Sequence, residues 1–247
     1  MTAPGSYSYA NPEPDIVTAI RDGDFVDMRP HPYGSNAVFT GLIEADAGQV
    51  RVIYKPQRGE APLWDFPMGT LYLRECAAFE LSRALGWDMV PFTIARDGPY
   101  GIGAVQFYVE HNPAETYFTL RNEHRVDLQR MALFDALANN ADRKGSHCLR
   151  DESGRLWGID HGLMFNEDYK LRTVIWDFEG EPIPDDLLSD LQDLSPRLED
   201  GSDCAVLLSE FLFNQEVDAL RDRLEVLLEE KIFPVAGLGR NVPWPPL

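Results

Sequence analysis

The sequence predicts an α+β protein with a sheet-rich N-terminal lobe and a mainly helical C-terminal lobe. Up to about residue 110, apolar and polar side chains alternate in short runs, which is typical of half-buried strands. Beyond residue 113 apolar side chains recur at helical spacing, most clearly over 126–139. We therefore expect one domain with a flexible arm over residues 1–14, an N-terminal lobe over 15–112 and a C-terminal lobe over 113–247.

The composition excludes several classes of protein. Of the 247 residues 44% are hydrophobic and 26% are charged, which is the mix of an ordinary globular protein. The net charge of −19 disfavours nucleic acids and anionic membranes as partners, and no apolar run is long enough to span a bilayer. Cys76, Cys148 and Cys204 form no CxxC motif, which favours reduced thiols and a cytoplasmic location.

The elements of the N-terminal lobe follow from the alternation. A short helix is expected over 15–21, and strands are expected over 36–44, 49–54, 90–95 and 103–110. Residues 46–48 read as the turn between the first two strands. A helix is expected over 70–85, with Thr70 as its N-cap and Gly86 as its end.

The C-terminal lobe begins with the helix over 126–139. A polar loop follows, and then two short apolar runs around a turn at 151–154, which predict a hairpin. Further helices are expected over 185–193, 203–213 and 216–232. The last has one apolar face, and we expect it to pack within the same chain and the protein to be a monomer. The sequence does not decide the role of the Pro-Trp-Pro-Pro segment near the C-terminus.

Two aspartates lie on either side of the predicted hairpin. Asp142 precedes its first strand and Asp160 ends its second, so both carboxylates should lie at the same end. Such a pair suits divalent-metal binding and proton transfer. His147 is a candidate second metal ligand, while Arg143 and Lys144 place positive charge beside Asp142. Turn-forming aspartates and a structural histidine are the alternative interpretation, and the histidine spacing disfavours a zinc site.

Lys55 and Glu75 form a second candidate pair. Lys55 ends an apolar strand, and Glu75 lies on the apolar stripe of the helix over 70–85. A carboxylate in that position is costly to bury unless it is paired, and the lysine is its natural partner. Lysine also binds phosphate as a point charge, and the loop containing Gly34 and Ser35 offers N–H groups and a hydroxyl for the same ligand. An ion pair at the rim and an ordinary turn are the alternatives.

This order of parts is similar to that of the protein-kinase-like superfamily. The chain lacks the GxGxxG, HRD and APE motifs of ordinary protein kinases and resembles the phosphatidylinositol 3-/4-kinase branch, especially type II phosphatidylinositol 4-kinases. Those enzymes carry Asn-x-Asp-Arg and then Ile-Asp-Asn-Gly. This chain has Asn-Ala-Asp-Arg at 140–143 and Ile-Asp-His-Gly at 159–162. The resemblance covers about residues 30–235 and is strongest to a bacterial family common in actinobacteria.

The resemblance implies a two-lobed protein-kinase-like fold that binds ATP with Mg²⁺ or Mn²⁺. Lys55 would hold the α- and β-phosphates, and Glu75 would orient the lysine. Backbone groups between the lobes, near 107–110, would meet the adenine ring. The implied nucleotide-binding residues are Lys55, Glu75, Gly34, Ser35, Phe107 and Val109.

The resemblance also implies the catalytic and metal-binding residues. Asp142 would accept or position the proton of the acceptor hydroxyl, and Asp160 would bind the metal ion. His147 stands where the family has a metal-binding Asn, which puts the second metal in doubt or shifts the preference toward Mn²⁺. The cations available to neutralise the γ-phosphate or an anionic acceptor are Lys144, Lys170 and Arg172.

We therefore expect an ATP-dependent phosphotransferase that acts on a hydroxyl of a protein or of a small cytosolic molecule. The acidic composition and the absence of a basic amphipathic helix or a palmitoylated cysteine cluster disfavour a lipid acceptor. Other readings stay open: a lipid kinase, an AMP transferase, an inactive pseudokinase that binds a nucleotide or a partner, or a metallohydrolase built on Asp142, His147 and Asp160.

Overall fold

The computed structural model describes residue 12 and residues 14–31, 36–45 and 48–247. Most of the expected arm over 1–14, the Gly34 and Ser35 loop and part of the turn at 46–48 lie outside these residues. The first helix, α1 (Pro14–Asp22), nearly matches its expected bounds.

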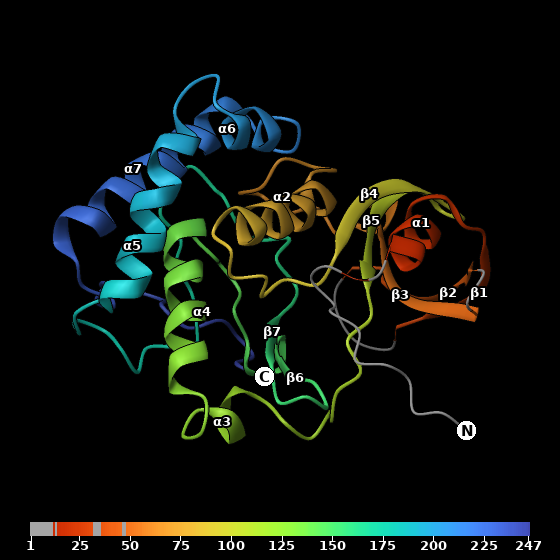
Figure 1. Cartoon of the computed structure of the whole chain (residues 1–247), viewed down its shortest axis with the longest axis horizontal. Helices are drawn as coiled ribbons and strands as arrows, with labels where there is room; N and C mark the ends of the chain where they lie inside the picture. Colours follow the sequence, from red (N-terminus) through yellow and green to blue (C-terminus); the bar gives the residue numbers. More distant parts are fainter. Residues whose placement is uncertain (1–11, 13, 32–35, 46–47) are drawn as a thin grey trace.

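The N-terminal part of the chain contains a five-stranded antiparallel sheet with the order β1-β2-β3-β5-β4. Its strands are β1 (Phe25–Pro30), β2 (Phe39–Ala45), β3 (Gly48–Pro56), β4 (Thr93–Gly98) and β5 (Gly101–Phe107). Side chains alternate along β3, so Val52 and Tyr54 are buried in the core and Lys55 lies on the opposite face. Helix α2 (Leu71–Ala84) packs beside β4 and β5 (Figure 1). Its residue Glu75 contacts the ammonium of Lys55.

The C-terminal part is mainly helical. Its helices are α3 (Tyr117–Leu120), α4 (Arg125–Ala138), α5 (Asp185–Leu194), α6 (Asp203–Leu208) and α7 (Asn214–Glu230). A hairpin of β6 (Cys148–Arg150) and β7 (Leu156–Gly158) lies between these helices and the sheet (Figure 1). Short 3-10 turns are η1 (Gln57–Gly59), η2 (Gly145–His147) and η3 (Ser195–Leu198). Helix α7 packs on α4 and α5 of the same chain, as expected from its apolar face.

Some elements differ from the expectation. Strand β1 was not expected, because it is a half-exposed edge strand with a bulge and so lacks clean alternation. The helix expected over 203–213 ends at Leu208, where the Ser209 hydroxyl bonds back to the carbonyl of Ala205 at 2.8 Å. Within the described residues, no helix combines the length and the apolar character needed to cross a membrane.

The N-terminus of α2 is capped differently from the expectation. Thr70 is the N-cap residue, as expected, but its hydroxyl donates to the carbonyl of Pro67 at 2.7 Å and makes no capping hydrogen bond. Instead, the Glu60 carboxylate accepts the N–H of Tyr72 at 2.9 Å, which suits the positive end of the helix dipole. Gly86 follows the helix with a φ of +68°, as the sequence predicts.

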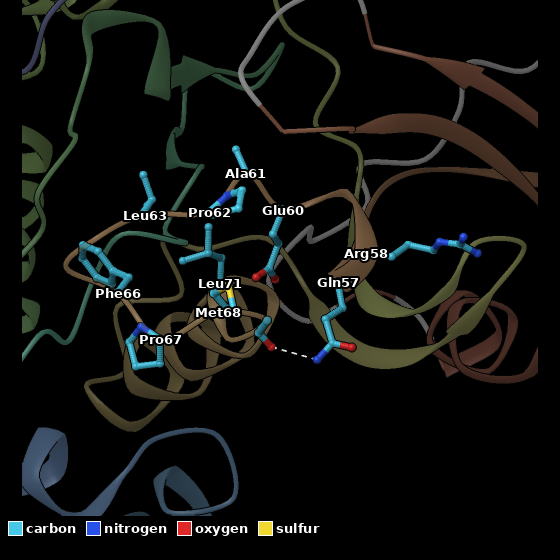
Figure 2. A pocket seen from close by; sticks show the side chains of 11 residues that line it. Gln57, Arg58, Glu60, Ala61, Pro62, Leu63, Phe66, Pro67, Met68 and Leu71 are labelled. Carbon is cyan, nitrogen blue, oxygen red and sulfur yellow. Dashed lines mark hydrogen bonds between the residues drawn. The ribbon is translucent and has the colours of Figure 1, made fainter.

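A pocket of about 190 Å³ lies beside this N-terminus. Its lining comes from η1, the segment before α2 and the first residue of α2, and includes Glu60 (Figure 2). Lys55, Asp142 and Asp160 are not part of the lining, so the pocket is separate from the candidate site.

Candidate active site

Lys55 connects the two lobes. Its ammonium forms an ion pair with Glu75 of α2, and it lies 3.0 Å from Oδ1 of Asp160, which follows β7. Burial alone would lower the pKa of Lys55, but the carboxylates of Asp160 and Glu75 outweigh burial and raise it. The lysine therefore keeps its charge between the two lobes.

Glu75 is bonded to both lobes through its two oxygens. Only 3% of its side chain is exposed. Besides the ion pair with Lys55, the carboxylate accepts the backbone N–H groups of His161 and Gly162, each at 3.1 Å. These hydrogen bonds offset the free-energy cost of burying the Glu75 carboxylate. The position of α2 is thereby tied to the backbone that directly follows Asp160.

Asp160 has an ionised, half-exposed carboxylate. Its backbone has a φ of +61°, a left-handed conformation that Asp and Asn adopt more readily than most other residues. The side chain is 49% exposed, with Oδ1 held by Lys55 and Oδ2 lying 3.2 Å from Nε2 of His147. Lys55 is the main reason that the pKa of Asp160 lies well below its usual range.

The two neighbouring histidines are both neutral. Burial lowers the pKa of His147 to about 4, despite the nearby carboxylate of Asp160. His161 is fully buried, and burial again lowers its pKa well below the usual value. The His161 ring packs edge-on against Phe134, with 5.9 Å between ring centroids, and neither ring nitrogen has a hydrogen-bond partner among the described residues.

Asp142 lies at the same end of the hairpin as Asp160. The bond from the Ile159 N–H to the carbonyl of His147, at 3.1 Å, continues the hairpin toward both aspartates. Nζ of Lys144 lies 2.9 Å from Oδ2 of Asp142. Burial raises the pKa of the Asp142 carboxyl, while Lys144 opposes this rise. A carboxylate with a raised pKa is a better proton acceptor than an ordinary aspartate.

Arg143 does not place its charge beside Asp142, so this expectation was wrong. Its side chain is fully buried and pairs with Asp135 of α4 at 2.9 Å. The same guanidinium donates to the carbonyls of Ile159 at 3.0 Å and His147 at 3.3 Å. Arg143 therefore supports the loop over 140–147, which carries Asp142, and the end of the hairpin.

Asp135 is a residue that the sequence analysis missed. Its carboxylate also accepts the side chains of Asn140 at 2.9 Å and Thr173 at 3.2 Å. The available signal was a carboxylate inside the apolar run of α4, which is the same kind of signal that identified Glu75.

We expect Asp135→Asn to reduce the free energy of unfolding by about 3–5 kcal/mol, because it leaves the buried guanidinium of Arg143 without a charged partner. Denaturant unfolding measures this loss. Asp127→Asn on the same helix is the control: its partly exposed carboxylate lies 3.8 Å from Arg130 and 3.3 Å from Nδ1 of His124, and the change should cost under about 1 kcal/mol. Equal effects of the two changes would contradict a supporting role for Asp135.

The C-terminal segment lies against the loop over 140–147, near the hairpin (Figure 1). The carbonyl of Pro246 accepts the N–H of Gly145 at 2.8 Å. The carbonyl of Asn241 accepts the N–H of Thr173 at 3.0 Å and the indole N–H of Trp176 at 2.9 Å. The Pro-Trp-Pro-Pro segment therefore contacts the loop over 140–147 through Pro246.

The remaining site residues are placed as follows. Phe107 is buried in the core, and its N–H already donates to the carbonyl of Phe92 at 2.8 Å, so this donor is not available to an adenine ring. Val109 belongs to a small apolar cluster with Leu149 and Trp157 at the junction of the lobes.

Lys170 is engaged by other side chains. Its Nζ lies 3.6 Å from Asp65 and 3.8 Å from Asp168, and 5.5 Å from the ring centroid of Trp64. Its charge is therefore already compensated. Arg172 is bonded through its backbone to Asn140 and to Arg143 of the catalytic loop.

The protein side chains alone do not complete a metal site. Across the described residues, no three His, Cys, Asp or Glu side chains gather into a group that could hold a metal ion.

Comparison with known proteins gives concordant results. Residues 71–210 match the family of phosphatidylinositol 3- and 4-kinases. The chain is 37% identical over 268 residues to Protein Rv2133c of Mycobacterium tuberculosis, which covers 94% of this chain and 95% of that protein. The fold is similar to the crystal structure of the Helicobacter pylori proinflammatory kinase CtkA, with a TM-score of 0.54 and 12% identity over 87% of this chain and 94% of that one. The expected two-lobed kinase-like fold is confirmed, whereas the closer likeness to type II phosphatidylinositol 4-kinases stays a prediction.

Proposed function

This chain belongs to the phosphatidylinositol 3- and 4-kinase family, and from that premise we propose that it is an ATP-dependent phosphotransferase. It would transfer the γ-phosphoryl group to a hydroxyl of a protein or of a small molecule. The nucleotide would lie between an N-terminal lobe over 15–112 and a C-terminal lobe over 113–247.

One observation carries the proposal. The ammonium of Lys55 is held between Glu75 of the N-terminal lobe and Asp160 of the C-terminal lobe. A cation in this position is available to the α- and β-phosphates, and Glu75 prevents it from turning away. A purely structural ion pair would not need a second, half-exposed carboxylate that opens to the cleft.

Asp142 is the group proposed to handle the proton of the acceptor. Its raised pKa suits a base that takes a proton as the hydroxyl oxygen attacks phosphorus. Lys144, which contacts this carboxylate, is placed to neutralise charge on the transferred phosphoryl group. The ion pair between Arg143 and Asp135 holds the loop that carries Asp142. This support would keep the Asp142 carboxylate oriented during transfer.

The residues beside Asp142 fit a divalent cation. Asp160 supplies an ionised, half-exposed carboxylate, and His147 supplies a neutral imidazole whose Nε2 lies beside it. Phosphate oxygens of the nucleotide would complete the coordination, since the described side chains do not complete it alone. The cation would offset phosphate charge, and the imidazole favours Mn²⁺ over Mg²⁺.

The experiment that tests the proposal is a calorimetric titration of the protein with ATP in Mg²⁺, in Mn²⁺ and with a chelator. We expect ATP to bind in the presence of either metal and to bind more weakly with the chelator. Metal-dependent binding without any phosphate release would favour the pseudokinase alternative. No binding under any condition would contradict the proposed function.

A further inference from the structure

The position of helix α2 decides whether the candidate site is assembled. Glu75 is the contribution of α2 to the site, and it must reach Lys55 on the sheet and the N–H groups of His161 and Gly162 in the other lobe. A small rotation or shift of α2 would break all three contacts together. Whatever fixes α2 therefore controls the orientation of Lys55.

Arg74, the residue next to Glu75, ties α2 to the C-terminal lobe. Only 1% of its side chain is exposed. Its guanidinium forms an ion pair with Glu216 of α7 and donates to the carbonyl of Met164 at 2.7 Å. The Phe66 ring centroid lies 5.0 Å from the same group. Arg74 thus contacts α7, the segment after Asp160 and the loop before α2.

Glu216 is itself held firmly in place. Its second oxygen accepts the backbone N–H of Phe213 at 3.0 Å, within the turn that starts α7. Further along α7, the Arg223 side chain donates to the carbonyls of Leu137 at 2.8 Å and Asn166 at 3.3 Å. The partner of Arg74 is therefore fixed to α4, the helix that leads into the catalytic loop.

A buried ion pair contributes little net free energy to folding. Moving both charges out of water costs about as much as their attraction returns, so an apolar pair of similar volume would stabilise the interface as well or better. An apolar contact, however, lets helices slide, whereas directional bonds from a guanidinium to two acceptors fix both position and rotation.

We propose that Arg74 and Glu216 are positioning residues, which fix α2 so that Glu75 holds Lys55 in place. The helix then needs no separate activating event to reach this position. The effect on activity rests on the proposed phosphotransferase function, but the geometric effect does not.

Two variants separate positioning from stability. Arg74→Met removes the charge and leaves Glu216 unpaired. Arg74→Met combined with Glu216→Met replaces the pair by apolar side chains and should restore folding stability. Asp190→Ala is the matched control, because it removes the bond from the Trp87 indole at 2.7 Å beyond the other end of α2.

Two measurements are made on the full chain. Amide hydrogen exchange at His161 and Gly162 reports directly on their bonds to Glu75, and phosphate release from ATP, with water as acceptor, reports on turnover. In the double variant we expect exchange at these two amides to be at least about tenfold faster than in wild type, with wild-type thermal stability. We also expect turnover to fall at least about tenfold, with a smaller change in KM for ATP. Asp190→Ala should leave both readouts unchanged.

The outcomes distinguish the proposals. If the double variant shows wild-type exchange at both amides, Arg74 and Glu216 only pack and the positioning role is wrong. If exchange responds as expected but wild type releases no phosphate, the positioning role stands and the phosphotransferase proposal fails. If the Arg74→Met single variant does not fold, amide exchange in the double variant alone tests the positioning role.

Discussion

Asp142→Asn is expected to reduce phosphotransfer by about 10²–10⁴-fold, the usual contribution of a general base, while ATP affinity stays nearly intact. The amide has the shape of the carboxylate but takes up no proton at neutral pH. Lys55, Glu75 and Asp160 do not depend on Asp142 for their contacts, so the nucleotide should still bind. Phosphate release from ATP measures the first effect, and calorimetric titration with ATP measures the second.

The same substitution should leave the fold stable. Burial raises the pKa of Asp142, so a neutral group is tolerated there, and its partner Lys144 keeps access to water. Glu152→Gln, at an exposed position in the turn of the same hairpin, is the control and should keep full activity. Wild-type phosphate release by Asp142→Asn would mean that Asp142 is not the base.

The parts of the site that the sequence predicts are those with a local signal. Glu75 interrupts the apolar stripe of a helix, and Lys55 ends a strand whose alternation is clear, so their pairing follows from the cost of an unpaired buried charge. Asp142 and Asp160 are brought together by a hairpin of only a few residues. In each case the information lies within one or two neighbouring elements.

The parts that the sequence does not predict depend on contacts between distant segments. The side chain of Arg143 turns inward because Asp135, eight residues earlier, lies beneath the loop, and the pattern of the loop itself does not show this. The Pro246 contact joins the chain end to Gly145, in the loop that carries Asp142, across about a hundred residues. The Arg74–Glu216 pair spans 142 residues along the chain. Contacts between segments that are far apart in the sequence leave no mark on side-chain periodicity.

Asp160→Asn is expected to abolish the contribution of metal to nucleotide binding. Asn tolerates the left-handed backbone conformation of residue 160, where φ is +61°. Ala at this position would add strain of about 1–2 kcal/mol. A loss of ATP binding in an Ala variant could then come either from the missing metal ligand or from a changed loop structure. The amide carries no charge for the cation and provides a weaker partner for Lys55, which keeps Glu75. Affinity for ATP in Mg²⁺ or Mn²⁺ should therefore fall by at least about tenfold, to the level seen with chelator.

Calorimetric titration with ATP under the three conditions measures this change. Asp168→Asn is the matched control, because that carboxylate is 81% exposed and lies on the segment that follows the site. It should bind ATP with wild-type metal dependence. If Asp160→Asn still gains as much affinity from metal as wild type does, Asp160 does not hold the cation, and the ion pair with Lys55 explains its position. If instead the metal dependence is lost while Asp142→Asn keeps it, the two aspartates have the separate roles proposed for them: one fixes the nucleotide and the other handles the acceptor proton.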